Sequence, residues 1–183
     1  MRPRIHVFAV AVVHYEHTEF STAHFAENDC RKFVEALQAL GAEPVNCVKL
    51  LGSDATKPAI EVALKHFIKG IDSRDTLVFL LAGNSVSFNE LNHLVSHDTQ
   101  LNDIQKTSFQ LGTVLKEIGE RNNCKALIFI HPKQCAHLTD SIVGTNTTSF
   151  SEKELRGFCE DAENRIAFIS CKDGESSWPN QSL

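Results

Sequence analysis

Six cysteines and nine histidines are the side chains best suited to nucleophilic or metal chemistry in this chain of 183 residues. The cysteines are Cys30, Cys47, Cys124, Cys135, Cys159 and Cys171. They form no C-x-x-C pair, which excludes the usual spacing of zinc knuckles and of thioredoxin-type redox sites. Four lie in apolar or periodic segments, so we expect buried thiols rather than a disulfide framework.

The histidines include two pairs with helical spacing, His14 with His17 and His93 with His97. A zinc site needs three or four ligands, and neither pair has a third ligand on a convincing helix. We therefore expect hydrogen-bonded or solvated histidines, with no metal site and no cofactor.

Composition and charge exclude several classes of protein. Hydrophobic residues make up 42% of the chain and charged residues 22%, as in a globular protein rather than a disordered one. The net charge of −5 is unlike the basic balance of nucleic-acid binders. No apolar run reaches the roughly 18 residues of a membrane span, and the N-terminus lacks the pattern of a secretory signal. We expect a cytoplasmic protein that contacts other proteins or small molecules, with no nucleic-acid or membrane partner.

Apolar runs and helical periodicity alternate along the chain. Strands are predicted at residues 5–13, 45–51, 76–82, 126–130 and 165–171. Helical spacing follows the first strand, with a stop at Gly41, and recurs after an N-cap at Thr56. Two further helices are predicted to begin with capping boxes at residues 107–110 and 151–154. Residues 88–98 are predicted to form a small hairpin.

This alternation predicts a single α/β domain over residues 1–183. It should be a three-layer, doubly wound domain with a mainly parallel sheet of about five to six strands and helices on both faces. Function in such sheets lies outside the carboxyl ends of the strands. The loops to examine therefore follow Val13, Ala82, Ile130 and Cys171.

No glycine-rich nucleotide motif follows any strand, but two strand ends carry a family pattern. These are LVFLLAGNSVS and ALIFIHPKQCA, and the chain resembles the caspase and metacaspase superfamily there. That family has Ala-Gly-His-Gly at the first position and Asp-x-Cys-His/Gln-Ser-Gly at the second. HFAENDCRKFVEALQALGAE, LLGSDATKPAIEVALKHF, LNHLVSHDT, TSFQLGTVLKEIGE and FISCKDGESSW resemble further family elements in order. The resemblance runs nearly from end to end and implies a caspase-like fold.

The departures from the family pattern fall on the catalytic positions. The family's catalytic histidine corresponds to Asn84, and its nucleophilic cysteine corresponds to Lys133. His131 stands where metacaspase-like members place an acidic residue of the specificity pocket. A cysteine protease needs a thiolate nucleophile and an imidazole proton shuttle, which asparagine and lysine do not supply. The resemblance therefore implies a catalytically inactive pseudocaspase, with Asn84 and Lys133 as a degenerate dyad on adjacent strand ends.

Three alternatives stay open. Cys135 is a candidate displaced nucleophile. Its base would be His131 or His137, which are close in sequence, or His93 or His97 brought near by the fold, and a partner chain could complete a cysteine endopeptidase. However, a shift of two residues moves a sulfur by several ångströms, whereas reaction tolerates about 1 Å. Lys133 could act as a Schiff-base amine, but nothing identifiable would lower its pKa. An unrelated α/β binding domain is the third alternative.

We expect a regulator, inhibitor, scaffold or cleavable substrate in a proteolytic signalling or defence pathway. The partner expected is a protein, namely an active caspase-like protease or its effector. The loop from Gln134 to Phe150 is long and polar, and is the candidate cleavage loop. The chain has a large-subunit-like portion, and the small-subunit portion of the family is expected to be truncated or absent. An edge strand left unpaired in this way would favour association with another chain.

Overall fold

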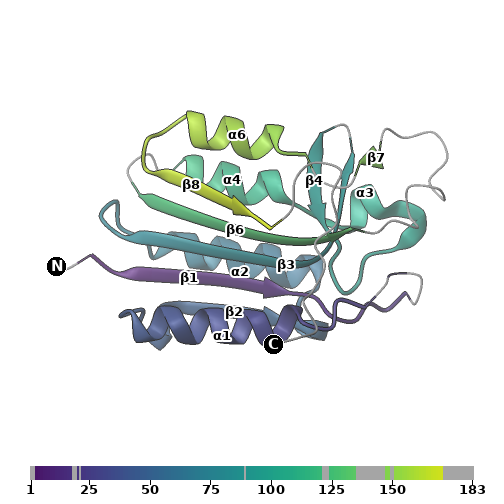
Figure 1. Ribbon diagram of the computed structural model, residues 1–183, viewed down its shortest axis with the longest axis horizontal. Helices are drawn as coiled ribbons and strands as arrows, with labels where there is room; N and C mark the ends of the chain where they lie inside the picture. The colour runs from purple at the N-terminus through teal and green to yellow at the C-terminus, as the bar shows by residue number, and fades with distance from the viewer. Residues whose placement is uncertain are drawn as a thin grey trace.

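The structure is a computed structural model that describes residues 3–17, 20, 22–88, 90–120, 124–134, 147–148 and 151–170. Within these ranges one eight-stranded sheet forms the centre of the molecule. Its strands are β1 (Ile5–Ala11), β2 (Cys47–Leu51), β3 (Thr76–Phe88), β4 (Leu91–Leu94), β5 (Phe109–Gln110), β6 (Lys125–Gln134), β7 (Thr147–Thr148) and β8 (Arg165–Ile169). The parallel part has the order β2-β1-β3-β6-β8 (Figure 1).

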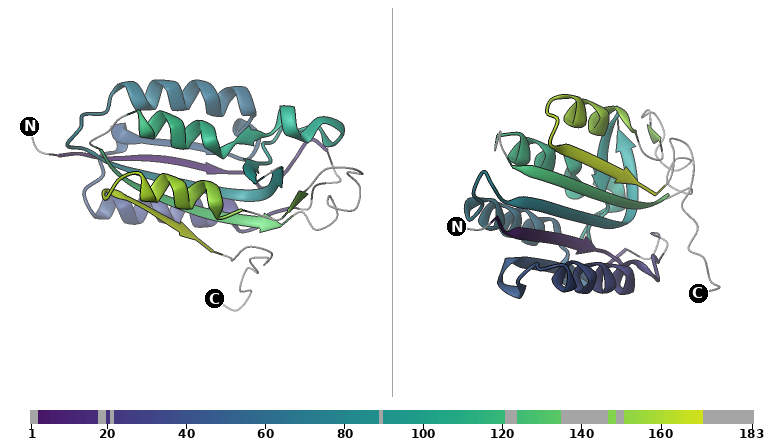
Figure 2. Two further views of the ribbon diagram at one scale, coloured as in Figure 1. Left: turned by 90° about the horizontal axis from the view of Figure 1, so that it is seen from above. Right: turned by 60° about the vertical axis from the view of Figure 1, so that its left-hand side comes forward.

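Helices cover both faces of the sheet. They are α1 (Ala26–Ala39), α2 (Lys57–Lys69), α3 (Ile104–Thr107), α4 (Leu111–Gly119) and α6 (Lys153–Glu160). Helix α1 packs on one face, and α2, α4 and α6 pack on the other (Figure 2). The predicted three-layer α/β class is confirmed. The short antiparallel strands β4, β5 and β7 raise the strand number above the five or six expected.

Strand β1 is buried on both faces, as its uninterrupted apolar run predicts. Phe8 and Val10 pack with residues of α2 and α4, whereas Val7 and Ala9 face Val34 of α1. Alternate residues of β1 therefore pack into the hydrophobic layer on each face of the sheet. This packing fixes the positions of the carboxyl ends of the central strands.

The predicted stop of α1 and start of α2 are confirmed. Gly41 has φ +108, and the amide of Ala42 donates to Leu37 O at 3.0 Å, which is a Schellman motif. At the start of α2, Thr56 Oγ1 accepts from the amide of Ala59 at 3.3 Å.

Both predicted capping boxes are wrong. Residues 107–110 instead end α3 and form β5, and α4 begins after Gln110 without a side-chain cap. At the second box, Ser151 Oγ accepts a long hydrogen bond from the amide of Lys153, at 3.4 Å. The Glu154 carboxylate accepts hydrogen bonds from Asn92 on β4 instead of reaching back to the amide of Ser151. A long-range partner thus replaces the local one that the pattern predicts.

Strand β3 is longer than predicted. It was expected to end at Gly83, but it continues to Phe88 because both of its edges remain paired. One edge follows β6 as far as Ser85, and the other turns to β4 in an antiparallel hairpin. The predicted hairpin therefore exists, with its first strand beginning before residue 88. None of the described helices is long and apolar enough to cross a bilayer.

Candidate functional site

The carboxyl ends of β3 and β6 carry the residues that sequence analysis identified. Their parallel register runs from Thr76 opposite Lys125 to Ser85 opposite Gln134. It places Asn84 opposite Lys133 and Ala82 opposite His131. Paired residues of neighbouring strands lie about 5 Å apart, so the predicted juxtaposition of Asn84 with Lys133 is confirmed.

Gly83 and Tyr15 close the space at these strand ends. Gly83 has φ +145, and a Cβ there would lie 3.1 Å from Val12 O and 3.3 Å from the Tyr15 hydroxyl. The Tyr15 hydroxyl donates to Val12 O at 3.2 Å and accepts from the amide of Asn84 at 2.9 Å. The loop after β1 is thereby joined to β3 at Asn84, the residue that the resemblance aligns with the family's histidine.

Asn84 is fully buried, with 0% of its surface exposed. Its carbonyl accepts from the amide of Val95 at 2.9 Å, so both backbone polar groups are used within the fold. Ser85 and Ser87, the next hydroxyl side chains along β3, are also buried, and neither hydroxyl has a hydrogen-bond partner among the residues that the structure describes. An amide side chain does not titrate near neutrality, so Asn84 supplies no base.

His93 on β4 lies next to a serine, but the geometry is that of a structural pair. Ser108 Oγ donates to Ile104 O at 2.6 Å, so the Nδ1–H of His93 donates to Ser108 Oγ at 2.9 Å. Burial, with a smaller effect of Lys57, lowers the pKa of His93 from 6.5 to about 4. Ser108 is itself fully buried and its proton is committed to a carbonyl, which leaves no activated nucleophile here.

The other described candidate histidines lie at separate places in the fold. His131 on β6 is half-buried beside Ala82. His97 Nδ1 donates to His14 O at 2.7 Å, and the amide of Glu16 donates to His97 O at 3.0 Å. These contacts fix the loop after β1 against the segment after β4. Over the described residues, no group of three histidine, cysteine or acidic side chains could hold a metal ion.

The described cysteines lie away from the β3–β6 strand ends. Burial raises the pKa of Cys30 to about 11, and burial also raises the pKa of Cys47 and of Cys159. Cys124 is buried before β6 and its thiol donates to Asp72 O at 3.3 Å. The thiols of Cys30, Cys47 and Cys159 therefore lack the lowered pKa of a nucleophile, and Cys124 is shielded from solvent.

Part of the predicted site lies outside the described residues. Cys135 is there, as are most positions of the loop from Gln134 to Phe150. At the two ends of that loop, Gln134 pairs with Ser85, and Thr147 and Thr148 pair with Phe88 and Ser87.

Tyr15 and Asn92 are site residues that sequence analysis missed. Tyr15 is the single tyrosine of the chain, and it follows a strand end already identified as functional. Its place just after this strand end was the signal in the sequence that could have identified it. Asn92 had none, because its partners Ser151 and Glu154 are about sixty residues away along the chain.

Comparison with known proteins places this geometry in a family. The caspase domain family model matches residues 6–182, so the chain belongs to the caspase domain family. A solved structure described as that of pro-sf-caspase-1 matches with a TM-score of 0.51 and 13% sequence identity. The match covers 73% of this chain and 47% of that chain, so this chain spans about half its length and shares the fold alone. No curated protein matches.

Proposed function

We propose that this chain is a non-catalytic caspase-like domain that acts by binding another protein. It serves as a regulator, inhibitor, scaffold or cleavable substrate in a proteolytic signalling or defence pathway. Its partner is an active caspase-like protease or an effector of one. The observation that carries the proposal is the pairing of a fully buried Asn84 with Lys133 at adjacent strand ends.

The chemistry of a cysteine peptidase requires groups that these positions lack. A thiolate must attack the scissile carbonyl, and an imidazole must return the proton to the leaving amine. Loss of such a nucleophile commonly removes a factor of about 10⁶ in rate, as in subtilisin. The buried, paired backbone around Asn84 further supports a structural role for this segment.

The edge of the sheet supports a role in association. Among the described residues, β8 pairs only with β6. Ile166 and Phe168 of β8 are each 49% exposed, on the same face of the sheet as α1, where Phe168 stacks on Phe129. An edge strand with exposed apolar side chains is a ready site for another chain.

Peptide hydrolysis tests the proposal. The purified chain would be incubated with fluorogenic peptides that carry Asp, Arg, Lys or Leu before the cut, with and without calcium. A Cys135→Ala variant would be measured beside a Cys47→Ala variant, which removes another thiol from a strand at the opposite edge. We expect no turnover in any of the three proteins. Turnover that Cys135→Ala abolishes and Cys47→Ala retains would make Cys135 a displaced nucleophile and overturn the proposal.

A further inference from the structure

A row of three aromatic rings runs across the α1-side face of the sheet and ends at its outer edge. The Phe33 ring of α1 lies 4.9 Å from the ring of Phe129 on β6. Phe129 stacks on Phe168 of β8, with ring centroids 4.7 Å apart. Figure 1 shows α1 beside β2 and β1, at the other side of the sheet from β8. Phe168 and Ile166 are half-exposed, so the described helices leave the outer end of this aromatic row open.

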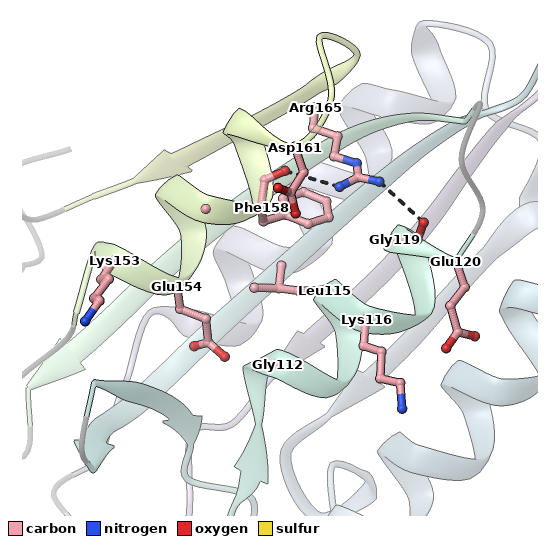
Figure 3. A pocket seen from close by; sticks show the side chains of 11 residues that line it. Gly112, Leu115, Lys116, Gly119, Glu120, Lys153, Glu154, Phe158, Asp161 and Arg165 are labelled. Atoms are coloured by element: carbon pink, nitrogen blue, oxygen red, sulfur yellow. Dashed lines mark hydrogen bonds between the residues drawn. The ribbon is translucent and has the colours of Figure 1, made fainter.

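Strand β8 lacks the charged side chain that commonly protects an edge strand. At the opposite edge of the sheet, β2 carries exposed Lys49 in its middle. The one charged residue of β8 is Arg165, and its guanidinium donates to Phe158 O at 3.3 Å and to Gly119 O at 3.4 Å. Figure 3 shows this side chain reaching toward α4 and α6, on the other face of the sheet. The edge of β8 is therefore apolar and suited to pairing with another strand.

The open backbone groups of β8 lie at its carboxyl end. The amide of Ser170 donates to Ile130 O on β6 at 3.1 Å. Because neighbouring residues of a strand direct their backbone groups to opposite sides, the N–H and C=O of Ile169 point to the outer edge, where no described strand pairs. The amide of Ala167 points the same way but is already directed to the Cys159 thiol. A further strand would thus find its hydrogen-bonding groups at Ile169.

The segment after β8 begins with a turn signal. Residues 171–183 read CKDGESSWPNQSL and lie outside the described residues. An Asp-Gly pair favours a hairpin. A two-residue loop at Asp173-Gly174 would require the backbone of Ser170 to face the new strand, whereas it faces β6. A three-residue loop over Lys172–Gly174 avoids this conflict, and it puts Gly174 at the left-handed position with which such loops end.

The three-residue loop fixes which residues lie opposite one another. Counting from the loop, Ser177 is opposite Ile169 in a hydrogen-bonded pair, as the outward backbone groups of Ile169 require. The next pair is Trp178 opposite Phe168, of the non-hydrogen-bonded class in which side chains lie closest. Paired residues point to the same face, so Trp178 extends the aromatic row. Pro179 follows, and because it has no amide to donate it ends the strand.

We propose that residues 175–178 fold back as an antiparallel edge strand on β8, with Trp178 packed against Phe168. The occupant of the open edge is therefore the chain's own C-terminal segment. A partner strand must displace this segment before it can pair with β8. The segment thus regulates the association proposed above, and the biological meaning of this closure rests on that proposed role.

Tryptophan fluorescence of the whole chain tests the placement, because Trp178 is the only tryptophan. Packed against Phe168, it emits at a shorter wavelength than in the same chain in urea, and acrylamide quenches it less. Phe168→Thr removes the opposite ring but keeps a residue that favours strands. Phe25→Thr is the matched control, since Phe25 is 38% exposed at the start of α1. We expect Phe168→Thr to shift the emission toward the urea value and Phe25→Thr to leave it unchanged.

Two substitutions at Gly174 test the loop. Valine is strained at a left-handed position, whereas asparagine is tolerated there. Gly174→Val should therefore move the emission and the acrylamide quenching toward their values in urea, and Gly174→Asn should keep those of the wild type. Far-UV circular dichroism and urea unfolding of each variant verify that the rest of the chain is folded.

Three results would each overturn the proposal. The first is wild-type emission and quenching equal to those in urea. The second is an emission shift in Phe25→Thr that Phe168→Thr does not show. The third is an equal effect of Gly174→Val and Gly174→Asn. Since hydrolysis is measured separately, such a failure would leave the non-catalytic role standing.

Discussion

At the scale of single residues, His93 shows how burial fixes the protonation of a side chain near the site. Its pKa falls from 6.5 to about 4, mainly because burial disfavours the imidazolium. Between these two values the unfolded chain binds a proton that the folded chain does not. Since the unfolded state binds more protons there, stability rises as pH rises through this window.

We expect the free energy of unfolding to increase between pH 4 and 6.5, with a contribution from His93 of up to about 3 kcal/mol. Urea unfolding across this range measures it. His93→Gln should lose that part of the pH dependence, whereas His66→Gln, at an exposed histidine of α2, should keep it. A His93→Gln chain with the pH slope of the wild type would show that His93 is not the group responsible.

At the scale of elements, one buried carboxylate joins the amino ends of β1 and β3. Asp75 accepts from the amide and guanidinium of Arg4, at 2.9 and 2.8 Å, and contacts His6 Nε2 at 3.0 Å. The amide of Asp72 also donates to it, at 3.0 Å. Burial acts to raise the pKa of Asp75, but these hydrogen bonds outweigh it and hold the pKa below its ordinary range.

Asp75→Asn should therefore destabilise the fold at neutral pH by about 3 kcal/mol, because Arg4 and His6 lose a buried ionic partner. Chemical unfolding at pH 7 gives this value. Asp103→Asn is the matched control, since Asp103 is only partly buried and pairs with exposed Lys106. That surface pair should contribute less than about 1 kcal/mol. Equal effects of the two substitutions would contradict the role assigned to Asp75.

The elements also show which parts of the fold are determined by residues close together in the sequence. The start of α2 and the end of α1 were predictable because Thr56 and Gly41 act on backbone atoms within a few residues. The capping box at Ser151 was not, since Glu154 is taken by Asn92 from another strand. The pairing of Asn84 with Lys133 was predictable from the family resemblance, whereas its closure by Tyr15 depends on tertiary contact alone.

At the scale of the whole molecule, residues 151–170 are bound to the rest of the fold through two elements, α6 and β8. Strand β8 pairs with β6 from Ala126 opposite Arg165 to Ile130 opposite Ile169. Leu155 and Phe158 of α6 are buried in the main core. Each such side chain contributes about 1.5–3 kcal/mol when buried. We therefore expect these packing contacts to hold the segment on the sheet even when the covalent chain before it is cut.

Asn92 strengthens that attachment at the end of the candidate cleavage loop. Its Nδ2 donates to Ser151 O at 2.8 Å, and the amide of Ser151 donates to Asn92 Oδ1 at 2.8 Å. Both residues are buried, so loss of the Asn92 side chain would leave backbone groups of Ser151 without partners at a cost of about 1–3 kcal/mol per group.

A cut within residues 135–146 should therefore leave two pieces that stay together. A recognition site for a specific protease, placed in that range, allows the cut to be made in the folded chain. We expect the two pieces to elute as one species in gel filtration at micromolar concentration, with the helical circular dichroism of the uncut protein. In the cut Asn92→Ala chain the urea midpoint should fall further below that of its uncut form than in the cut wild type. Separation of the wild-type pieces without denaturant would show instead that the covalent loop, rather than β8, α6 and Asn92, holds the segment in place.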